Sequence, residues 1–376
     1  MVLLFGVGFL GVAYAYFGYP LVLWVWGRIR PRPVKSDDAF TPSVSIILPV
    51  HNEAAGLEAK LSNLLELDYP ADRLEVCVIS DGSTDETVSI ARAYEAGCSF
   101  LRVIDLEIQG GKAGALNVGL RETSNEIVVF TDAGILLEPG SLRRLVGPFA
   151  DVSIGCASGE DRVTGGGGEA LYGRYELFLR RKESEVASIV GASGSYYAQR
   201  RELCGAFPEA IAPDFLSVLR TVEQGFRAVT VPGAGGTMQA TTSHGKEFLR
   251  KVRTLVRGMT GLFGKVTLLD PFRTGAFAFI LFSHKVMRWL TPWFLLAMLV
   301  SNLFLLDSPV FRFLAIPHIG FYLLGAVGLL GPGALRRWIP SRIAAYFVTV
   351  HAAILVAWWR YFRGMRQEIW SPTVRS

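Results

Sequence analysis

The sequence has few cysteines, and their spacing limits the sites they can form. Its 376 residues include 4 cysteines, and no two of them form a CxxC pair. They stand at Cys77, Cys98, Cys156 and Cys204. This spacing argues against a zinc site and against a disulfide framework, and it fits a reducing compartment.

The chain also lacks the glycine motifs that bind phosphate groups in many enzymes. It contains no GxxxxGK[ST] loop and no GxGxxG after an apolar strand, so neither a P-loop nor a Rossmann dinucleotide site is indicated. The net charge of +5 is modest, and no stretch interleaves basic and aromatic residues as RNA-binding strands do. We therefore expect no nucleic-acid partner.

Charge is absent from one long segment near the start of the chain. Residues 2–26 are uncharged and long enough to cross a hydrocarbon core of about 30 Å as a helix. A secretory signal is the alternative, but the apolar run is too long, no basic stretch precedes it, and no small-residue cleavage site follows. We expect a transmembrane helix over 1–27. Further candidates within 290–362 are 290–307, 311–331 and 343–359.

A basic cluster follows the first apolar run, at Arg28, Arg30, Arg32 and Lys35. Positive charge beside a span favours the cytoplasmic side. We therefore predict a cytoplasmic domain over 28–272. Residues 273–289 are expected to form an interfacial or re-entrant helix, and residues 363–376 a basic tail whose side of the membrane stays open.

Within 28–272 the pattern alternates between strands and helices. Short β-branched runs at 44–50, 74–80 and 126–130 end at polar turns, and helical patterns cover 84–96 and 112–120. Such alternation predicts an α/β fold with a mostly parallel sheet. Ligands of these sheets bind beyond the carboxyl ends of the strands. The polar residues at those ends are His51, Asn52, Glu53, Asp81 and Asp132.

These strand ends bring separate carboxylates together with Lys112, which follows paired glycines. Carboxylates can accept hydrogen bonds from ribose or a base, or hold a divalent cation, while cations neutralise a diphosphate. The combination indicates a nucleotide-sugar. The alternative is that these residues shape turns, and for Asp85 we favour a place beside the start of the 84–96 helix.

Six short stretches then carry a family resemblance. Residues 43–260 resemble the family 2 glycosyltransferases with a GT-A fold, in the order and spacing of "SIILPVHNE", "VISDGSTDET", "GGKAGALN", "FTDAG", "GASGSYYAQRRE" and "APDF". With the apolar flanks, the chain looks like membrane-integrated bacterial members that build polysaccharides, relatives of cellulose and hyaluronan synthases. The resemblance implies a location in the bacterial inner (plasma) membrane.

The resemblance also implies roles for particular residues. Asp214 would be the catalytic base, and Asp132 would be the first Asp of the Asp-x-Asp motif, which holds Mg²⁺ or Mn²⁺. Glu53 and Asp81 would contact a uridine and its ribose, and Lys112 the diphosphate. The full donor-side set is Pro49, His51, Glu53, Asp81, Lys112 and Asp132. The implied donor is a UDP-sugar, and the acceptor a polysaccharide or a lipid-linked sugar.

Two departures from the family pattern matter. Gly134 replaces the second Asp of Asp-x-Asp, which removes an expected metal ligand, and His244 is a speculative second ligand. The synthase motif near the diphosphate and acceptor appears as "RKVRT", where Arg250 and Arg253 are kept and Thr254 replaces Trp. That Trp helps form the acceptor site in processive synthases, so the departure bears on long-chain synthesis.

The segment carrying "RKVRT" reads as an amphipathic helix. Lys246, Arg250, Arg253 and Arg257 share one face by their spacing. The opposite face holds Phe248, Val252, Leu255, Met259 and Leu262. The basic face lies either on anionic lipid or toward a diphosphate. We favour the diphosphate, because the helix directly follows the segment with Asp214.

Several functions fit these features. The leading hypothesis is an inverting, membrane-bound glycosyltransferase that extends a cell-surface or exopolysaccharide chain, with membrane lipids and other export subunits as partners. A close variant adds one sugar to a lipid-linked acceptor. A non-catalytic glycosyltransferase-like subunit is a third hypothesis, motivated by Gly134. A transporter is disfavoured, because the apolar runs hold few of the charges that such pathways need.

Overall fold

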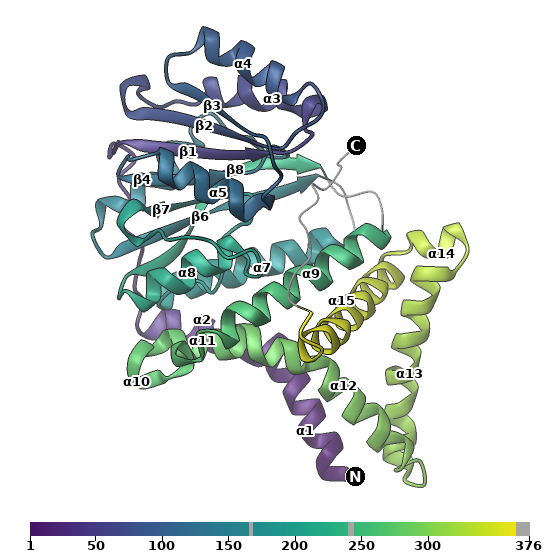
Figure 1. The fold of residues 1–376 in the computed structure, drawn as a ribbon. Helices are drawn as coiled ribbons and strands as arrows, with labels where there is room; N and C mark the ends of the chain where they lie inside the picture. Colours follow the sequence, from purple (N-terminus) through teal and green to yellow (C-terminus); the bar gives the residue numbers. More distant parts are fainter. Residues whose placement is uncertain (165–167, 240–243, 366–376) are drawn as a thin grey trace.

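The computed structural model describes residues 1–164, 168–239 and 244–365. A domain built on one β-sheet stands on a group of long helices, and helices α7 (Gly168–Val186) and α9 (His244–Phe263) lie between the two parts (Figure 1). The sheet domain positions the candidate site, and the long helices carry most of the exposed apolar surface.

The sheet has eight strands in the order β3-β2-β1-β4-β7-β6-β8-β5. The first four in this order, which come from the N-terminal half of the domain, are mutually parallel. Their bounds are β1 Val44–Val50, β2 Leu74–Asp81, β3 Leu101–Leu106 and β4 Ile127–Thr131. The runs predicted to be strands therefore lie within one residue of the observed bounds, and the predicted α/β class is confirmed.

The other half of the sheet is mixed. Strand β7 (Tyr196–Arg200) runs antiparallel to both β4 and β6 (Ile154–Thr164). Strand β8 (Arg227–Gln239) is parallel to β6, and the short β5 (Leu136–Leu137) closes the edge. The reversal at β7 places the segment 191–195, which leads into this strand, beside the carboxyl end of β4.

Helices cover both faces of the sheet. The apolar faces of α3 (Ala54–Leu65) and α4 (Thr87–Gly97) join one core with alternate residues of β1, such as Ile46. Helix α5 (Gly111–Glu122) joins the other core, with Ile47. The remaining elements here are α6 Ser141–Val146, α8 Pro213–Glu223, and the short turns Ala71–Arg73, Gly147–Ala150, Arg201–Leu203 and Val266–Leu269. Both faces of β1 are buried, which explains its unbroken apolar sequence.

Helix α4 begins at Thr87, three residues after the predicted start at Thr84. Asp85 explains the difference, because its carboxylate accepts hydrogen bonds from the backbone N–H groups of Thr87 (3.0 Å) and Ala54 (3.2 Å). One side chain therefore satisfies N–H groups at the starts of both α4 and α3. The helix-flanking interpretation of Asp85 is correct, and its carboxylate is committed to the fold.

Four helices are long and apolar enough to cross a membrane by length and composition, and they span Val2–Ile29, Ala276–Leu303, Pro309–Leu330 and Ile339–Phe362. The first comprises α1 Val2–Ala13, a π-helical turn Tyr14–Gly18 and α2 Tyr19–Ile29. After α10 (Pro271–Thr274), the second comprises α11 Ala276–Leu281, a π-helical turn Phe282–Val286 and α12 Met287–Leu303. The others are α13 Pro309–Leu330 and α15 Ile339–Phe362, joined by α14 Gly333–Arg337.

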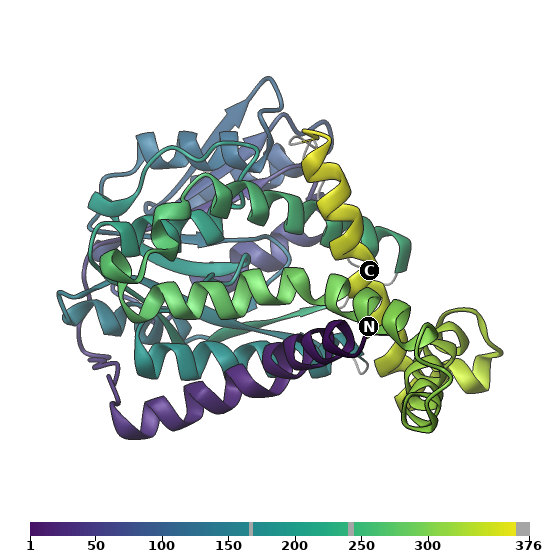
Figure 2. The same ribbon diagram turned by 90° about the horizontal axis from the view of Figure 1, so that it is seen from below.

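The segment 273–289 was predicted to be an interfacial or re-entrant helix. Its first two residues end α10, and residues 276–289 are continuous in helix with residues 290–303. Their depth in a bilayer stays a prediction. Helix α1 packs along α12, and α2 runs beside α7 (Figure 2). Gly8 and Gly11 make the first contact possible, since a Cβ at either position would lie within 2.7 Å of Phe294 or Met298. Small residues allow this close approach between membrane helices.

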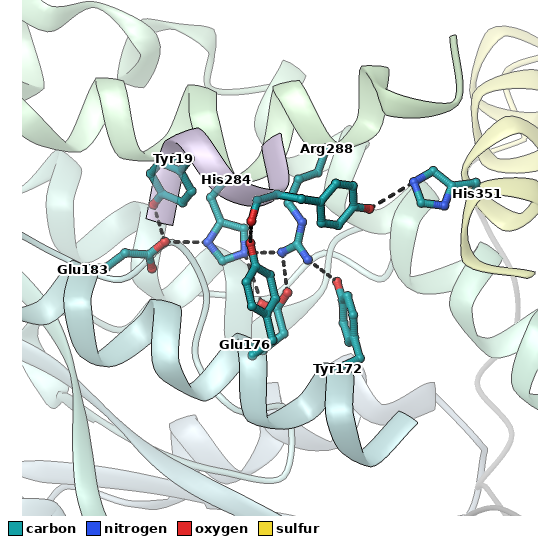
Figure 3. Close-up of polar contacts among 9 residues, drawn as sticks. Tyr19, Tyr172, Glu176, Glu183, His284, Arg288 and His351 are labelled. Atoms are coloured by element: carbon teal, nitrogen blue, oxygen red, sulfur yellow. Dashed lines mark hydrogen bonds and ion pairs between the residues drawn. The ribbon is translucent and has the colours of Figure 1, made fainter. Parts of the chain in front are cut away.

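A group of polar residues, buried except for the partly exposed Glu176, joins the sheet domain to the long helices, and we call it the polar seam (Figure 3). It comprises Tyr19, Glu176, Glu183, His284 and Arg288. Glu183 accepts a hydrogen bond from Tyr19 (2.5 Å) and contacts His284 Nδ1 at 2.5 Å. Glu176 pairs with Arg288 and lies 3.1 Å from His284 Nε2. A hydrogen bond thereby ties α2 to α7, and the Glu176–Arg288 ion pair ties α7 to α12.

Candidate functional site

The rim of the site forms where β1 and β2 end. His51 Nδ1 donates a hydrogen bond to the backbone carbonyl of Asp81 (2.6 Å), which fixes the proton on this ring nitrogen. Asn52 has a positive φ of 53°, and its side chain accepts from the Thr84 N–H (2.8 Å). Asn tolerates this left-handed conformation better than most residues. These contacts join the loops after two neighbouring parallel strands into one rigid edge.

Asp81 is the most deeply buried carboxylate at this edge, with 0% of its surface exposed. One oxygen, Oδ1, accepts a hydrogen bond from the Gly110 N–H at 2.7 Å. The other oxygen, Oδ2, is buried and has no hydrogen-bond partner among the described residues. A buried carboxylate oxygen without a partner is costly. Its free acceptor capacity therefore suits a ligand that brings a donor.

Lys112 and Asp132 form the second part of the site. Helix α5 begins at Gly111, so Lys112 stands in its first turn and its ammonium reaches Asp132 Oδ1 at 2.5 Å. The same ammonium donates to the carbonyl of Gly194 at 3.1 Å. The lysine side chain is 17% exposed and the aspartate 37%, so water and ligands can reach the pair. This ion pair is open to exchange with an anionic ligand.

A small pocket gathers the third carboxylate beside this pair. Asp214, the second residue of α8, lies opposite Gly194, whose added Cβ would stand 3.8 Å from Asp214 Oδ2. The pocket is lined by Lys112, Leu116, Phe130, Thr131, Asp132, Gly194, Tyr197, Pro213 and Asp214. Three residues that the sequence placed in one site, Lys112, Asp132 and Asp214, therefore meet in space.

Helix α9 brings positive charge toward Asp214. The Arg257 guanidinium donates to the Ile211 carbonyl at 2.8 Å, just before α8. Burial lowers the pKa of Arg257, and the charge of Asp214 acts in the opposite direction. Val252 and Met259 on the apolar face of α9 are fully buried in the core. The apolar face therefore packs on protein, in line with the interpretation we favoured over lipid.

Several other residues predicted for the site lie away from the pocket. Pro49 is buried inside β1, and Glu53 precedes α3 with its backbone N–H bonded to Thr87. Arg250 and Arg253 lie on α9 two turns and one turn before Arg257, respectively, and Thr254 is exposed. None of these five lines the pocket described above. His244 begins α9, but its side chain falls outside the described part of the chain.

The side chains at the site limit how a divalent cation could be held. Within 1–164, 168–239 and 244–365, no group of three or more His, Cys, Asp or Glu side chains is arranged to hold a metal. Asp132 offers one carboxylate, and Gly134 offers no side chain. Mg²⁺ commonly binds through one or two carboxylates plus substrate phosphates and water. The residues therefore fit a cation that arrives with a diphosphate.

Sequence reasoning missed Lys60, which is 0% exposed beneath the loop that carries Asp132. Its ammonium donates to Thr131 Oγ1 (3.0 Å) and to the Ile135 carbonyl (2.7 Å). Burial lowers the pKa of Lys60 to about 7, while nearby Asp132 acts in the opposite direction. The available signal was a lysine three residues after Leu57 on the apolar face of a helix.

The mixed sheet, with carboxylates grouped beyond the ends of its parallel strands, defines a class: the GT-A fold of glycosyltransferases. Residues 45–204 match the family described as Glycosyl transferase family 2. The chain thus contains a family 2 glycosyltransferase domain, as the motifs predicted.

Two curated relatives illustrate the breadth of the family. The poly-beta-1,6-N-acetyl-D-glucosamine synthase of Staphylococcus epidermidis is 28% identical over 188 residues, covering 46% of this chain and 43% of that protein. The beta-monoglucosyldiacylglycerol synthase of a Synechocystis strain is 36% identical over 182 residues, covering 47% of this chain and 36% of that protein. The matches thus span less than half the length of these relatives.

Among solved structures, a mannosyltransferase from Pyrobaculum calidifontis in complex with GDP-Man and Mn²⁺ resembles nearly the whole chain. It has a TM-score of 0.75 and 27% identity, covering 96% of this chain and 99% of that one. TarS from S. aureus, in complex with UDP-GlcNAc, has a TM-score of 0.52 at 16% identity and supports the fold alone. The first likeness extends beyond the sheet domain into the long helices.

Proposed function

We propose that the protein is a membrane-bound, inverting glycosyltransferase that passes a sugar from a nucleotide-sugar to a growing cell-surface or exopolysaccharide chain. The observation that carries this proposal is the pocket in which Lys112, Asp132 and Asp214 meet. The basic residues after the first apolar helix favour a cytoplasmic catalytic domain at the bacterial plasma membrane.

The side chains suggest a division of work. Asp214 accepts the proton of the acceptor hydroxyl as that oxygen attacks the anomeric carbon. The bond from this carbon to the diphosphate breaks, so one displacement inverts the anomeric centre and releases a nucleoside diphosphate. Lys112 exchanges its Asp132 partner for a diphosphate oxygen and stabilises the developing charge. Asp81 Oδ2 receives a hydrogen bond from the nucleoside.

A divalent cation, Mg²⁺ or Mn²⁺, would be held by Asp132 together with the diphosphate, and it would supply charge stabilisation to the leaving group. Because Gly134 contributes no ligand, we expect modest affinity for the ion without donor. Turnover should fall in excess chelator and return with added metal. Full turnover in chelator would show that Lys112 and the basic face of α9 suffice.

The proposal has two forms, which differ in the nucleobase of the sugar donor. The family resemblance favours a UDP-sugar, whereas the Pyrobaculum calidifontis mannosyltransferase was solved with GDP-Man. Purified protein in detergent, incubated with UDP- and GDP-sugars, should release nucleoside diphosphate from one of them. The Asp214→Asn variant in parallel should lose this release, which separates the activity from a contaminant.

The acceptor has two candidates. The relative named as a poly-N-acetylglucosamine synthase favours a polysaccharide. The relative named as a glucosyldiacylglycerol synthase, and the exposed Thr254 where processive synthases have Trp, favour single addition to a lipid-linked acceptor. Product length distinguishes them. Tight nucleotide binding without transfer from any donor would instead indicate a non-catalytic subunit.

A further inference from the structure

Lys60 stands beneath the candidate site without touching the pocket. Helix α3 buries Leu57, Leu61 and Leu64 on one face, and Lys60 shares that face by its spacing. Its ammonium crosses from the helix to the carboxyl end of β4. There it donates to Thr131 Oγ1 at 3.0 Å and to the Ile135 carbonyl at 2.7 Å. These two partners flank the loop of Asp132, Ala133 and Gly134.

Burying an ammonium is expensive, with an effective penalty of several kcal/mol for an ion in a protein interior. Both hydrogen-bond partners of Lys60 are neutral, so no carboxylate in direct contact offsets this penalty. Packing alone does not explain the residue, because Met or Leu would fill this position without that cost. The charged group that interacts with Lys60 is Asp132, whose negative charge opposes the lowering of the Lys60 pKa.

The loop itself has few other attachments on this side. The Asp132 N–H donates to the Ser195 carbonyl at 3.0 Å, while the Ile135 N–H reaches the Asp132 carbonyl only at 3.5 Å. Gly134 has no side chain with which to hold the turn. Lys60 therefore ties the two ends of the loop to α3, while Lys112 meets Asp132 from the solvent side at 2.5 Å.

We propose that Lys60 is a positioning residue for donor binding: it holds the Asp132 loop in place and keeps positive charge beneath it when Lys112 turns to the diphosphate. This inference rests on the proposed function, because it assumes that the pocket takes a nucleoside diphosphate. Lys60 contacts no substrate and acts through Thr131, Ile135 and Asp132.

The chain offers a matched control on the same helix. Asn63, one turn after Lys60, accepts from the Leu137 N–H (2.7 Å) and donates to the Leu137 carbonyl (2.8 Å). The variants Lys60→Met and Asn63→Leu each remove two hydrogen bonds between α3 and residues 131–137. They differ in that Lys60→Met also removes the charge beneath Asp132.

We expect Lys60→Met to weaken UDP or GDP binding, measured by calorimetry with Mn²⁺, by about 10–100-fold, as residues behind a ligand site typically do. Asn63→Leu should change affinity by less than about threefold at a comparable loss of thermal stability. Equal affinity in wild type and Lys60→Met would overturn the proposal.

A second measurement needs no nucleotide. Amide hydrogen exchange of residues 132–135 in the ligand-free protein should accelerate at least about tenfold in Lys60→Met and stay near wild type in Asn63→Leu. Unchanged exchange in Lys60→Met contradicts the positioning role, whether or not any nucleotide binds. Wild-type protein that binds neither nucleotide contradicts the proposed function instead. If Lys60→Met fails to fold, Thr131→Val tests the same loop and should accelerate exchange; unchanged exchange there would count against the proposal.

Discussion

The pocket and the polar seam both contain charged groups away from bulk water, yet they complete their interactions differently. In the seam, Glu176 and Glu183 each contact a cation or hydrogen-bond donor on another helix. In the site, Asp81 Oδ2 has no partner among the described residues, and the Lys112–Asp132 pair is partly exposed. Each region keeps one buried carboxylate oxygen without a hydrogen-bond partner among the described residues, Glu183 Oε2 in the seam and Asp81 Oδ2 in the site. The two regions differ in access, because the seam's charged groups are enclosed between helices, whereas the Lys112–Asp132 pair is open to a ligand.

Substitutions in the two regions should therefore have different effects. A change in the pocket should alter binding or rate and leave the fold nearly as stable, because those groups are incompletely satisfied before a ligand arrives. A change in the seam should cost stability, because removing one partner leaves a buried charge uncompensated. The predictions below test this contrast.

The largest effect is expected from Asp214→Asn, which keeps the size of the side chain and removes the base. Transfer should fall by about 10²–10⁴-fold, because general-base catalysis typically contributes that much. Donor affinity should change little, and stability should fall by no more than about 1 kcal/mol from the lost charge at the start of α8. Sugar transfer and calorimetric donor binding are measured on one preparation. Transfer at the wild-type rate would remove Asp214 from the mechanism.

The next effect concerns the seam. Arg288→Met should destabilise the protein by roughly 3–5 kcal/mol, because Glu176 loses its cationic partner and keeps only its contact with His284. Thermal melting in detergent measures this loss. The control is Arg273→Met, whose ion pair with Asp270 is 3.8 Å long with side chains 67% and 41% exposed, and it should change little. Equal melting temperatures for the two variants would contradict the contrast between seam and surface.

Asp81→Asn should weaken donor nucleotide binding by about 10–100-fold, or roughly 1.4–2.8 kcal/mol. Stability should hold or rise, because the Gly110 bond can persist while an unpartnered buried charge is removed. Asp85→Ala is the matched control from the same loop. It should cost about 0.5–2 kcal/mol of stability as a lost helix cap, with donor affinity intact. Unchanged donor binding in Asp81→Asn together with weaker donor binding in Asp85→Ala would contradict the proposed donor site.

The last test is a pH dependence of stability. Because burial lowers the pKa of Lys60 from 10.5 to about 7, the unfolded chain binds more protons than the folded chain between these values. This group therefore makes the free energy of unfolding rise as pH increases from about 7 toward 10.5. Denaturant titrations of wild type and Lys60→Met across this range should differ in slope. Identical slopes would mean that Lys60 titrates normally.

The sequence by itself predicted three of the four parallel strands, β1, β2 and β4, and the residues at their ends, but not β3. Runs buried on both faces must be apolar throughout, and the polar turns after them mark the edge where ligands bind. The order of Asp81, Lys112, Asp132 and Asp214 then indicated one site, and the pocket holds three of the four. Periodicity also separated the buried apolar face of α9 from its basic face.

Tertiary structure decided what depends on partners distant in the chain. Helical spacing placed Lys60 on the apolar face of α3, but only folding brought its ammonium to Thr131 and Ile135, which lie 71 and 75 residues further along the chain. The seam required His284 and Arg288 to meet Glu176 across more than 100 residues. Local periodicity reports which face of a helix is buried, but not which charges face each other there. That pairing decides whether a buried charge stabilises the fold or serves the site.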